Sequence, residues 1–203
     1  MTKIKICGLK REEDIYYANK LKPDYIGFVF AKSSRQIDKY RARELIMGLD
    51  KSIKKVGVFL NHPMEEVKGI AKFCELDILQ FHGDEDPLYC NSFENKVWKA
   101  FRIKDSDSLK QLEKYNVDGF LLDTYTKGTY GGTGKVFNWE IVSNISENKF
   151  VILAGGLNPQ NAEKSIEAVN PQVLDVSSGV EVDGVKDFEK MKKFIENVRG
   201  SCG

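Results

Sequence analysis

Two side chains that can take part in chemistry stand at the ends of apolar, strand-like segments. Asp123 directly follows the apolar run that ends at Leu122, and Cys7 ends the run Lys3–Cys7. A carboxyl group at the rim of a strand is a candidate general acid or base, or else the cap of a turn. A lone cysteine normally fills the core, but Cys7 is followed by a glycine and occupies the equivalent place on the first strand.

Two glycine-rich loops near the end of the chain have the chemistry of a phosphate site. The seventh strand-like segment runs into Gly155 and Gly156, and the eighth runs into Ser178 and Gly179. Glycines let backbone N–H groups approach a ligand, although either loop alone also fits an ordinary turn. Loops after strands seven and eight form a recurrent phosphate site in (β/α)8 barrels. We therefore predict that these four residues bind phosphate.

The longest connection, residues 124–137, follows the sixth strand-like segment. It is rich in glycine and hydroxyl residues, and a long loop in a compact domain is usually either functional or disordered, so we expect that it could fold over a substrate. The segment superficially resembles a nucleotide-binding P-loop. That motif requires Ser or Thr after its lysine, whereas Val136 follows Lys135. Nucleotide binding is therefore excluded.

Strand-like and helix-like segments alternate along the whole chain. The candidate strands are Lys3–Cys7, Tyr25–Phe30, Lys55–Leu60, Ile78–Phe81, Val97–Phe101, Gly119–Leu122, Phe150–Ala154 and Val173–Val176. The candidate helices include Arg11–Lys20, Tyr40–Leu49, Met64–Cys74, Ser108–Tyr115, Trp139–Ser143, Asn161–Ala168 and Val185–Val198. This order predicts an α/β fold with a parallel sheet, closed as a single-domain (β/α)8 TIM barrel over residues 1–203 with short loops. A doubly wound open sheet is the alternative.

The composition is that of an ordinary globular protein. The chain has 203 residues, 41% hydrophobic and 30% charged, with 31 Lys and Arg against 30 Asp and Glu. This balance argues against nucleic acid. No apolar run approaches the ~20 residues of a membrane span, and no signal peptide precedes the first strand. We expect a cytoplasmic protein. Four cysteines without a CxxC pair and two histidines make a structural zinc site or a disulfide framework unexpected.

Six segments together resemble the phosphoribosylanthranilate isomerase family of tryptophan biosynthesis. They span residues 3 to 187 in the order of that family, and their combination is highly specific. These segments are Lys5-Ile6-Cys7-Gly8, Gly27-Phe28-Val29-Phe30 with Ser33-Ser34-Arg35, Gln80-Phe81-His82-Gly83, Leu122-Asp123 with Gly131-Gly132-Thr133-Gly134, Leu153-Ala154-Gly155-Gly156-Leu157, and Asp175-Val176-Ser177-Ser178-Gly179-Val180-Glu181.

The resemblance implies an Amadori rearrangement of N-(5'-phosphoribosyl)anthranilate to an amino-ketose phosphate without cofactor or metal. It makes Asp123 the general acid that opens the furanose ring and Cys7 the general base that removes the C2' proton. It places Arg35 at the anthranilate carboxylate, and Gly132 and Asp175 among the residues that bind substrate. His82 is expected to line the pocket or to cap a helix, without a catalytic role. The only partner expected is this small-molecule substrate, bound by a monomer or a homodimer.

The two catalytic roles make demands on the pKa values of both groups. A thiol with an ordinary pKa near ~8.5 must ionise more easily to act as a base, and an aspartate starting near ~3.9 must hold a proton. Lys5 is two residues before Cys7, so its side chain should also point into the barrel and favour the thiolate. A buried lysine needs a partner, and Asp175, on the neighbouring eighth strand, is the candidate.

Two departures from the motifs of the family and two alternative functions stay open. The family commonly has Ser-Pro-Arg where this chain has Ser33-Ser34-Arg35, and Phe-Asp-Trp where it has Phe137-Asn138-Trp139. One alternative is another sugar-phosphate barrel enzyme, such as indoleglycerol-phosphate synthase or the histidine-pathway isomerase, which has an aspartate where this chain has Cys7. The other is a barrel that only binds a phosphorylated ligand, for which neither Cys7 nor Asp123 is needed.

Overall fold

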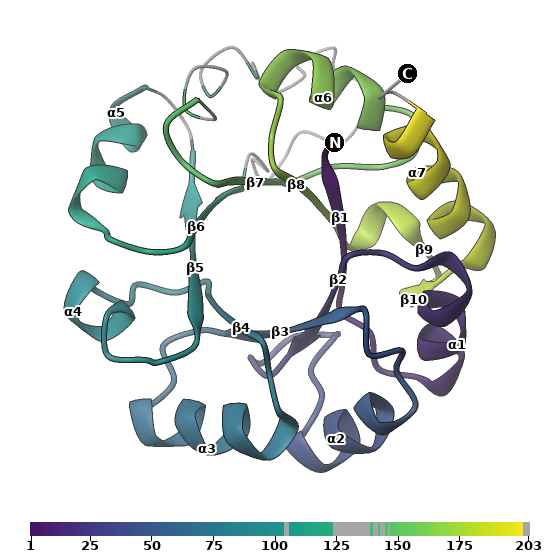
Figure 1. The fold of residues 1–203 in the computed structure, drawn as a ribbon, viewed down its shortest axis with the longest axis horizontal. Coiled ribbons are helices and arrows are strands. Elements are labelled where there is room, and N and C mark those ends of the chain that lie inside the picture. Colours follow the sequence, from purple (N-terminus) through teal and green to yellow (C-terminus); the bar gives the residue numbers. More distant parts are fainter. Residues whose placement is uncertain (104–105, 124–138, 140–141, 143–144, 146, 201–203) are drawn as a thin grey trace.

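Eight parallel strands close into a barrel in the computed structural model, which describes residues 1–103, 106–123, 139, 142, 145 and 147–200 (Figure 1). The strands are β1 (Lys3–Cys7), β2 (Tyr25–Val29), β3 (Lys54–Phe59), β4 (Ile78–Phe81), β5 (Lys96–Arg102), β6 (Gly119–Asp123), β7 (Val151–Ala154) and β8 (Val173–Val176). Strand β1 pairs in parallel with both β2 and β8, which closes the sheet. The predicted barrel is confirmed, and the open sheet is excluded.

The core lies in two layers because the strands are buried on both faces. Every residue of β4, β7 and β8 is buried, as expected for a parallel sheet covered by helices. One cluster, which includes Val56, Trp98 and Ile152, fills the interior of the barrel. A larger cluster, which includes Phe28 of β2 and Phe194 of the last helix, packs the outer face of the sheet against the helices.

The helices form a ring around the barrel (Figure 1). They are α1 (Glu12–Leu21), α2 (Lys39–Met47), α3 (Met64–Cys74), α4 (Pro87–Cys90), α5 (Ser106–Leu109), α6 (Ala162–Val169) and α7 (Phe188–Gly200), with short 3-10 helices at η1 (Lys110–Lys114) and η4 (Ser178–Val180). Local chemistry sets their starts: the Asp38 carboxylate caps α2, and Asp86 caps α4 just before its first residue, a proline. In the part of the chain described, no helix has the length and apolarity to cross a membrane.

Two helix predictions differ from the structure. The predicted helix Val185–Val198 begins only at Phe188, because Val185–Lys186 forms strand β10, which pairs with β9 (Glu181–Val182) in a separate hairpin. The segment predicted as one helix over Ser108–Tyr115 is divided between α5 and η1. The predicted helix Trp139–Ser143 lies mostly outside the described residues.

Candidate functional site

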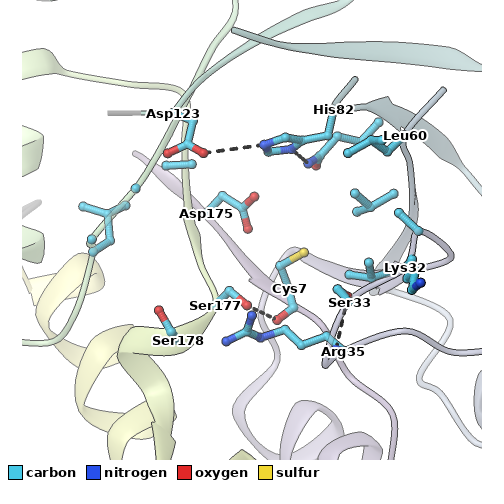
Figure 2. Close-up of a pocket in the computed structure, with 18 residues that line it drawn as sticks. Cys7, Lys32, Ser33, Arg35, Leu60, His82, Asp123, Asp175, Ser177 and Ser178 are labelled. Atoms are coloured by element: carbon cyan, nitrogen blue, oxygen red, sulfur yellow. Dashed lines mark hydrogen bonds and ion pairs between the residues drawn. The ribbon is translucent and has the colours of Figure 1, made fainter. Parts of the chain in front are cut away.

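One cavity of about 420 Å³ opens at the carboxyl ends of the strands (Figure 2). Parallel strands place their ends at the same rim, so residues far apart in the sequence meet there. The predicted site residues that line this cavity are Cys7, Arg35, His82, Asp123, Gly155, Gly156, Asp175 and Ser178. Gly132 lies outside the described residues. Gly179 lies next to Ser178 but is not among the lining residues.

Cys7 owes its place to a close approach between the first two strands. Its thiol is buried, with 8% of the residue exposed, and Cys7 pairs in register with Gly27 of β2. A Cβ atom at Gly27 would lie 2.7 Å from the Cys7 Sγ atom, so any larger residue there would displace the thiol. The Ser177 hydroxyl donates a hydrogen bond to the Cys7 carbonyl at 3.0 Å, which ties β1 to the loop after β8.

A buried ion pair lies directly below the thiol. Lys5 is fully buried, and its Nζ atom lies 2.7 Å from Oδ2 of Asp175, its partner in register on β8. This pair confirms the partner expected for Lys5. The other carboxylate oxygen, Oδ1, is buried and has no hydrogen-bond partner among the described residues. Asp175 is also one of the residues that line the cavity.

Burial and the nearby ammonium groups shift the pKa of the Cys7 thiol in opposite directions. Burial raises the pKa of the thiol above its ordinary value, and the Asp175 carboxylate adds to that rise. The Lys5 and Lys186 ammonium groups lower the pKa, as expected for Lys5, but they do not outweigh the burial. Burial also raises the pKa of Asp175, against the pull of Lys5. The net direction at Cys7 is thus opposite to the easier ionisation that a base near neutral pH needs.

Asp123 and His82 face each other across the cavity mouth (Figure 2). The His82 Nε2 atom lies 3.5 Å from Oδ2 of Asp123. The other ring nitrogen, Nδ1, lies 3.2 Å from the side-chain nitrogen of Gln80, which is buried and also lines the cavity. His82 therefore belongs to the lining of the cavity, the first of the two places expected for it. No role was predicted for Gln80, although it lies on β4 in the same sequence segment as His82.

The loops after β7 and β8 meet at the same rim. Gly155 and Gly156 adopt φ angles of 94° and 66°, which favour glycine. A Cβ atom at Gly179 would lie 1.8 Å from the Leu157 carbonyl oxygen, so this glycine allows the two loops to touch. The backbone of both loops is therefore brought to one side of the cavity, next to Ser178.

Arg35 reaches the cavity from the loop after β2 and is held by a carboxylate. Its Nε and Nη2 atoms donate to the two Glu181 oxygens at 2.8 and 2.6 Å. The Lys186 Nζ atom lies 2.5 Å from Glu181 Oε1. Burial alone would raise the pKa of Glu181, but these two cations lower it to about 2. No function was predicted for Glu181 or Lys186, although Asp183-Gly184 between two valines is a strong hairpin signal and would have placed them opposite each other.

The described residues show no cluster of three or more His, Cys, Asp or Glu side chains suited to a metal ion. Cys7, Cys74 and Cys90 are free thiols.

Comparison with known proteins agrees with this geometry. The model of the N-(5'-phosphoribosyl)anthranilate isomerase family matches residues 4–197. The isomerase of that name from Thermoanaerobacter sp. (strain X514) is 58% identical over 201 residues, covering 98% of this chain and 99% of the relative. The crystal structure of the Thermotoga maritima enzyme superposes with a TM-score of 0.90 at 35% identity, covering 98% of this chain and 100% of that one. A phosphoribosylanthranilate isomerase in complex with reduced 1-(o-carboxyphenylamino)-1-deoxyribulose 5-phosphate has a TM-score of 0.87 at 31% identity, with coverage of 98% and 100%. This chain belongs to the N-(5'-phosphoribosyl)anthranilate isomerase family.

Proposed function

We propose that this protein converts N-(5'-phosphoribosyl)anthranilate to 1-(2-carboxyphenylamino)-1-deoxyribulose 5-phosphate by an Amadori rearrangement, a step of tryptophan biosynthesis. The observation that carries the proposal is the shared cavity, which is lined by Cys7, Asp123 and the glycine loops after β7 and β8. A barrel that only binds a phosphorylated ligand would need the loops but not the thiol and the carboxyl group. Family membership supports the same substrate.

The phosphate group of the substrate would bind the loops after β7 and β8. Gly155, Gly156 and Gly179 carry no side chains that cover their backbone N–H groups, and the Ser178 hydroxyl adds a donor. Such backbone donors are well suited to phosphate oxygens. Binding at one side of the rim would extend the ribose across the cavity, between Asp123 and Cys7.

Ring opening would be the work of Asp123. The protonated carboxyl group gives its proton to the furanose ring oxygen, and the bond from that oxygen to C1' breaks. The nitrogen lone pair forms the C1'=N double bond of a Schiff base, and Asp123 is left as a carboxylate. The His82 ring, 3.5 Å from this carboxyl group, would help to orient it.

Cys7 would then remove the proton from C2'. The electron pair of that C–H bond forms the C1'=C2' double bond, and the electrons of C1'=N return to nitrogen to give an enolamine. Protonation at C1' and loss of the hydroxyl proton at C2' give the ketone, so the atoms of substrate and product balance. The adjacent Lys5 ammonium would stabilise the thiolate. No cofactor or metal takes part in these steps.

Arg35 would bind the carboxylate of the anthranilate ring, because a guanidinium group offers planar pairs of donors. It lines the cavity together with Cys7 and His82. The solved relative with a bound reduced product analogue supports a ligand that carries both a carboxylate and a phosphate. We further propose a cytoplasmic enzyme that acts as a monomer or homodimer, with neither nucleic acid nor a membrane as partner; one solved relative is a monomeric form of a dimeric enzyme.

The test is an assay with freshly made phosphoribosylanthranilate, followed by the loss of its fluorescence. We expect turnover by the natural protein and a loss of roughly 10²–10⁴-fold in Cys7→Ser and Asp123→Asn, the range for removal of a general acid or base. The matched control is Cys90→Ser, since Cys90 is buried on α4 away from the cavity lining. A natural protein without turnover, or a near-normal rate in either variant, would refute the proposal or the assigned role.

A further inference from the structure

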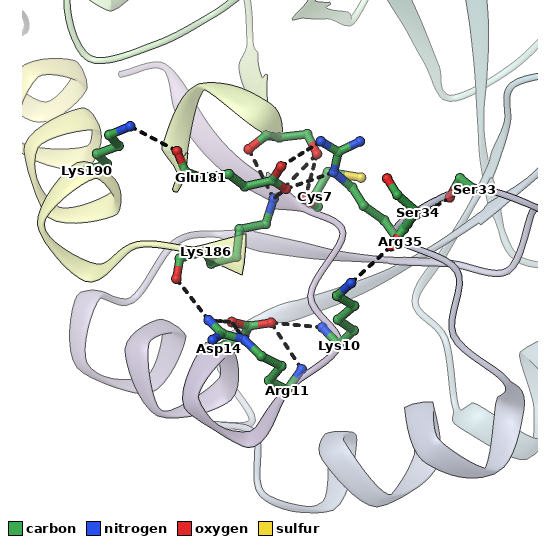
Figure 3. Close-up of polar contacts among 11 residues, drawn as sticks. Cys7, Lys10, Arg11, Asp14, Ser33, Ser34, Arg35, Glu181, Lys186 and Lys190 are labelled. Atoms are coloured by element: carbon green, nitrogen blue, oxygen red, sulfur yellow. Dashed lines mark hydrogen bonds and ion pairs between the residues drawn. The ribbon is translucent and has the colours of Figure 1, made fainter. Parts of the chain in front are cut away.

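Three charged side chains form a compact network beside Cys7, which we name the Arg35 clamp: Arg35, Glu181 and Lys186 (Figure 3). Glu181 accepts from two atoms of the Arg35 guanidinium group and from the Lys186 ammonium group. The side chains of Glu181 and Lys186 are 7% and 1% exposed, whereas that of Arg35 is 28% exposed and lines the cavity. Only Arg35 can therefore meet a ligand.

The hairpin after β8 sets the distance between Glu181 and Lys186. The two residues are opposite each other in the antiparallel pair β9–β10. The turn that joins the strands contains Asp183 and Gly184, both with positive φ angles of 50° and 77°, as required for a tight two-residue turn. Directly opposed, oppositely charged side chains on such a ribbon contact each other readily. The carboxylate and its cation are therefore placed by the backbone before any ligand binds.

The clamp is fixed to the rest of the rim from several sides (Figure 3). The Lys186 carbonyl accepts from the Arg11 guanidinium group at 2.9 Å, and its ammonium group donates to the Ser177 carbonyl at 3.0 Å. The Arg35 stem crosses Gly8, where a Cβ atom would lie 2.5 Å from the Arg35 Cδ atom. The network thus joins the loops that follow β1, β2 and β8.

The charges of the clamp do not cancel. Arg35 and Lys186 are cations and Glu181 is an anion, so the clamp carries one net positive charge. Without Lys186, the bidentate pair of Arg35 and Glu181 would be neutral and would attract an anion weakly. Because the pair uses Nε and Nη2 of Arg35, the Nη1 atom lies outside it and can turn to a ligand.

We infer that Glu181 and Lys186 are positioning residues for substrate recognition: Glu181 orients Arg35, and the buried Lys186 balances the charge of Glu181 so that Arg35 keeps its attraction for the substrate carboxylate. The inference rests on the proposed function, in which Arg35 binds that carboxylate. Neither residue touches the substrate, so their effect falls on its affinity rather than on the chemical steps.

The test compares Glu181→Gln and Lys186→Met with Lys190→Met as the matched control. Lys190 donates to the Glu181 carbonyl but not to its carboxylate, and its loss changes the net charge by the same amount as Lys186→Met. We expect KM for phosphoribosylanthranilate to rise roughly 10- to 100-fold in the first two variants, the size of a charge-assisted hydrogen bond, with kcat changed far less. KM should stay within about twofold of the natural value in Lys190→Met.

A second measurement separates positioning from folding. The dissociation constants of two reduced product analogues, one with the ring carboxylate and one without it, are compared in the natural protein and in Lys186→Arg and Lys186→Met. We expect Lys186→Arg to keep the preference for the carboxylate and Lys186→Met to lose it. In Arg35→Met, addition of Glu181→Gln should have little further effect, because the two residues act as a unit.

The outcomes distinguish the two proposals. A natural protein that does not turn over phosphoribosylanthranilate overturns the proposed function. A natural protein that is active, with Lys186→Met and Glu181→Gln no different from Lys190→Met, overturns the role of the clamp alone. If both analogues lose affinity equally, Glu181 and Lys186 have a merely structural role, and the proposed role of the clamp is again overturned.

Discussion

Two of the buried lysine–carboxylate pairs in the described part of the chain contain a lysine on a barrel strand, and they differ in how many of their polar atoms have hydrogen-bond partners. Glu85 lies 3.3 Å from Lys99, and both side chains are nearly inaccessible. The Glu85 oxygens accept from the backbone N–H groups of Asn61 and Gly83, and the Lys99 ammonium group also donates to two carbonyls. The pair of Lys5 and Asp175 is closer, at 2.7 Å, yet one Asp175 oxygen has no partner among the described residues.

We expect this difference to separate a structural pair from a functional one. A buried polar group without a partner costs free energy. The unpartnered oxygen belongs to a residue that lines the cavity, whereas Glu85 does not line it. We therefore expect the Lys99 pair to stabilise the loops after β4 and the Lys5 pair to serve the reaction.

The largest effect should come from the structural pair. Glu85→Gln leaves the Lys99 charge buried without its counterion, and loss of one member of a buried pair costs about 3–5 kcal/mol of unfolding free energy. We expect urea denaturation to show this loss, while the folded fraction keeps the natural kcat/KM. The neighbouring Asp84→Asn serves as control, because Asp84 is exposed. A strong loss of activity per folded molecule in Glu85→Gln would contradict the comparison.

The pair of Lys5 and Asp175 should lose activity as well as stability, because Asp175→Asn also leaves the buried Lys5 charge without its counterion. Asp175→Asn keeps the shape of the side chain but removes its charge, so the group that faces the cavity no longer accepts on both oxygens. We expect kcat/KM to fall by about 10²-fold or more, as when one electrostatic partner of a reacting group is removed. The measurement is steady-state kinetics on protein shown by circular dichroism to be folded. Near-natural activity would place Asp175 with Glu85 as a structural residue.

Some of these features could be predicted from the sequence because they depend on local order. The eight strands, the residues at their ends and the Lys5–Asp175 pair follow from alternation and from closure of the barrel. The Glu181 partner of Arg35 could not be predicted in this way, because neither residue lies on a strand of the barrel and the register of the barrel therefore does not bring them together. The hairpin was missed because Phe188, Met191 and Ile195 have a helical spacing that was extended back to Val185.

The protonation of Cys7 could not be predicted either, since it depends on the sum of opposing environments. Sequence reasoning identified the Lys5 ammonium group, which does lower the pKa of the thiol. It did not include the desolvation that burial imposes, which is the largest influence and acts in the other direction. Burial at a strand end depends on the whole rim of the barrel, including Gly27 and the loop after β8.

The pH dependence of the reaction gives a smaller, sharper test of the Lys5 pair. A base must be deprotonated, and the pKa of Cys7 is raised, so the ascending limb of the kcat/KM profile that reports Cys7 should lie above neutrality. In Lys5→Met the thiolate loses its nearest cation, the pKa rises further, and the limb should move to higher pH. Lys3→Met is the control, because Lys3 is on the same strand but exposed at the opposite end of the barrel. If the limb of the kcat/KM profile that reports Cys7 does not move in Lys5→Met, Lys5 has a merely structural role.

The smallest effect should be the acid dependence of stability that Glu181 contributes; both oxygens of its carboxylate accept hydrogen bonds, like those of Glu85. Its folded-state pKa of about 2 lies below the ordinary value of 4.5. A depressed pKa contributes stability that is present above the unfolded value and is lost as the pH falls through the folded value. Thermal denaturation should therefore show a decrease in Tm between pH 4.5 and about 2 that is smaller in Glu181→Gln. Arg35 and Lys186 stay charged over this range, so the difference reports Glu181 alone. Equal decreases in both proteins would mean that the clamp contributes recognition without stability.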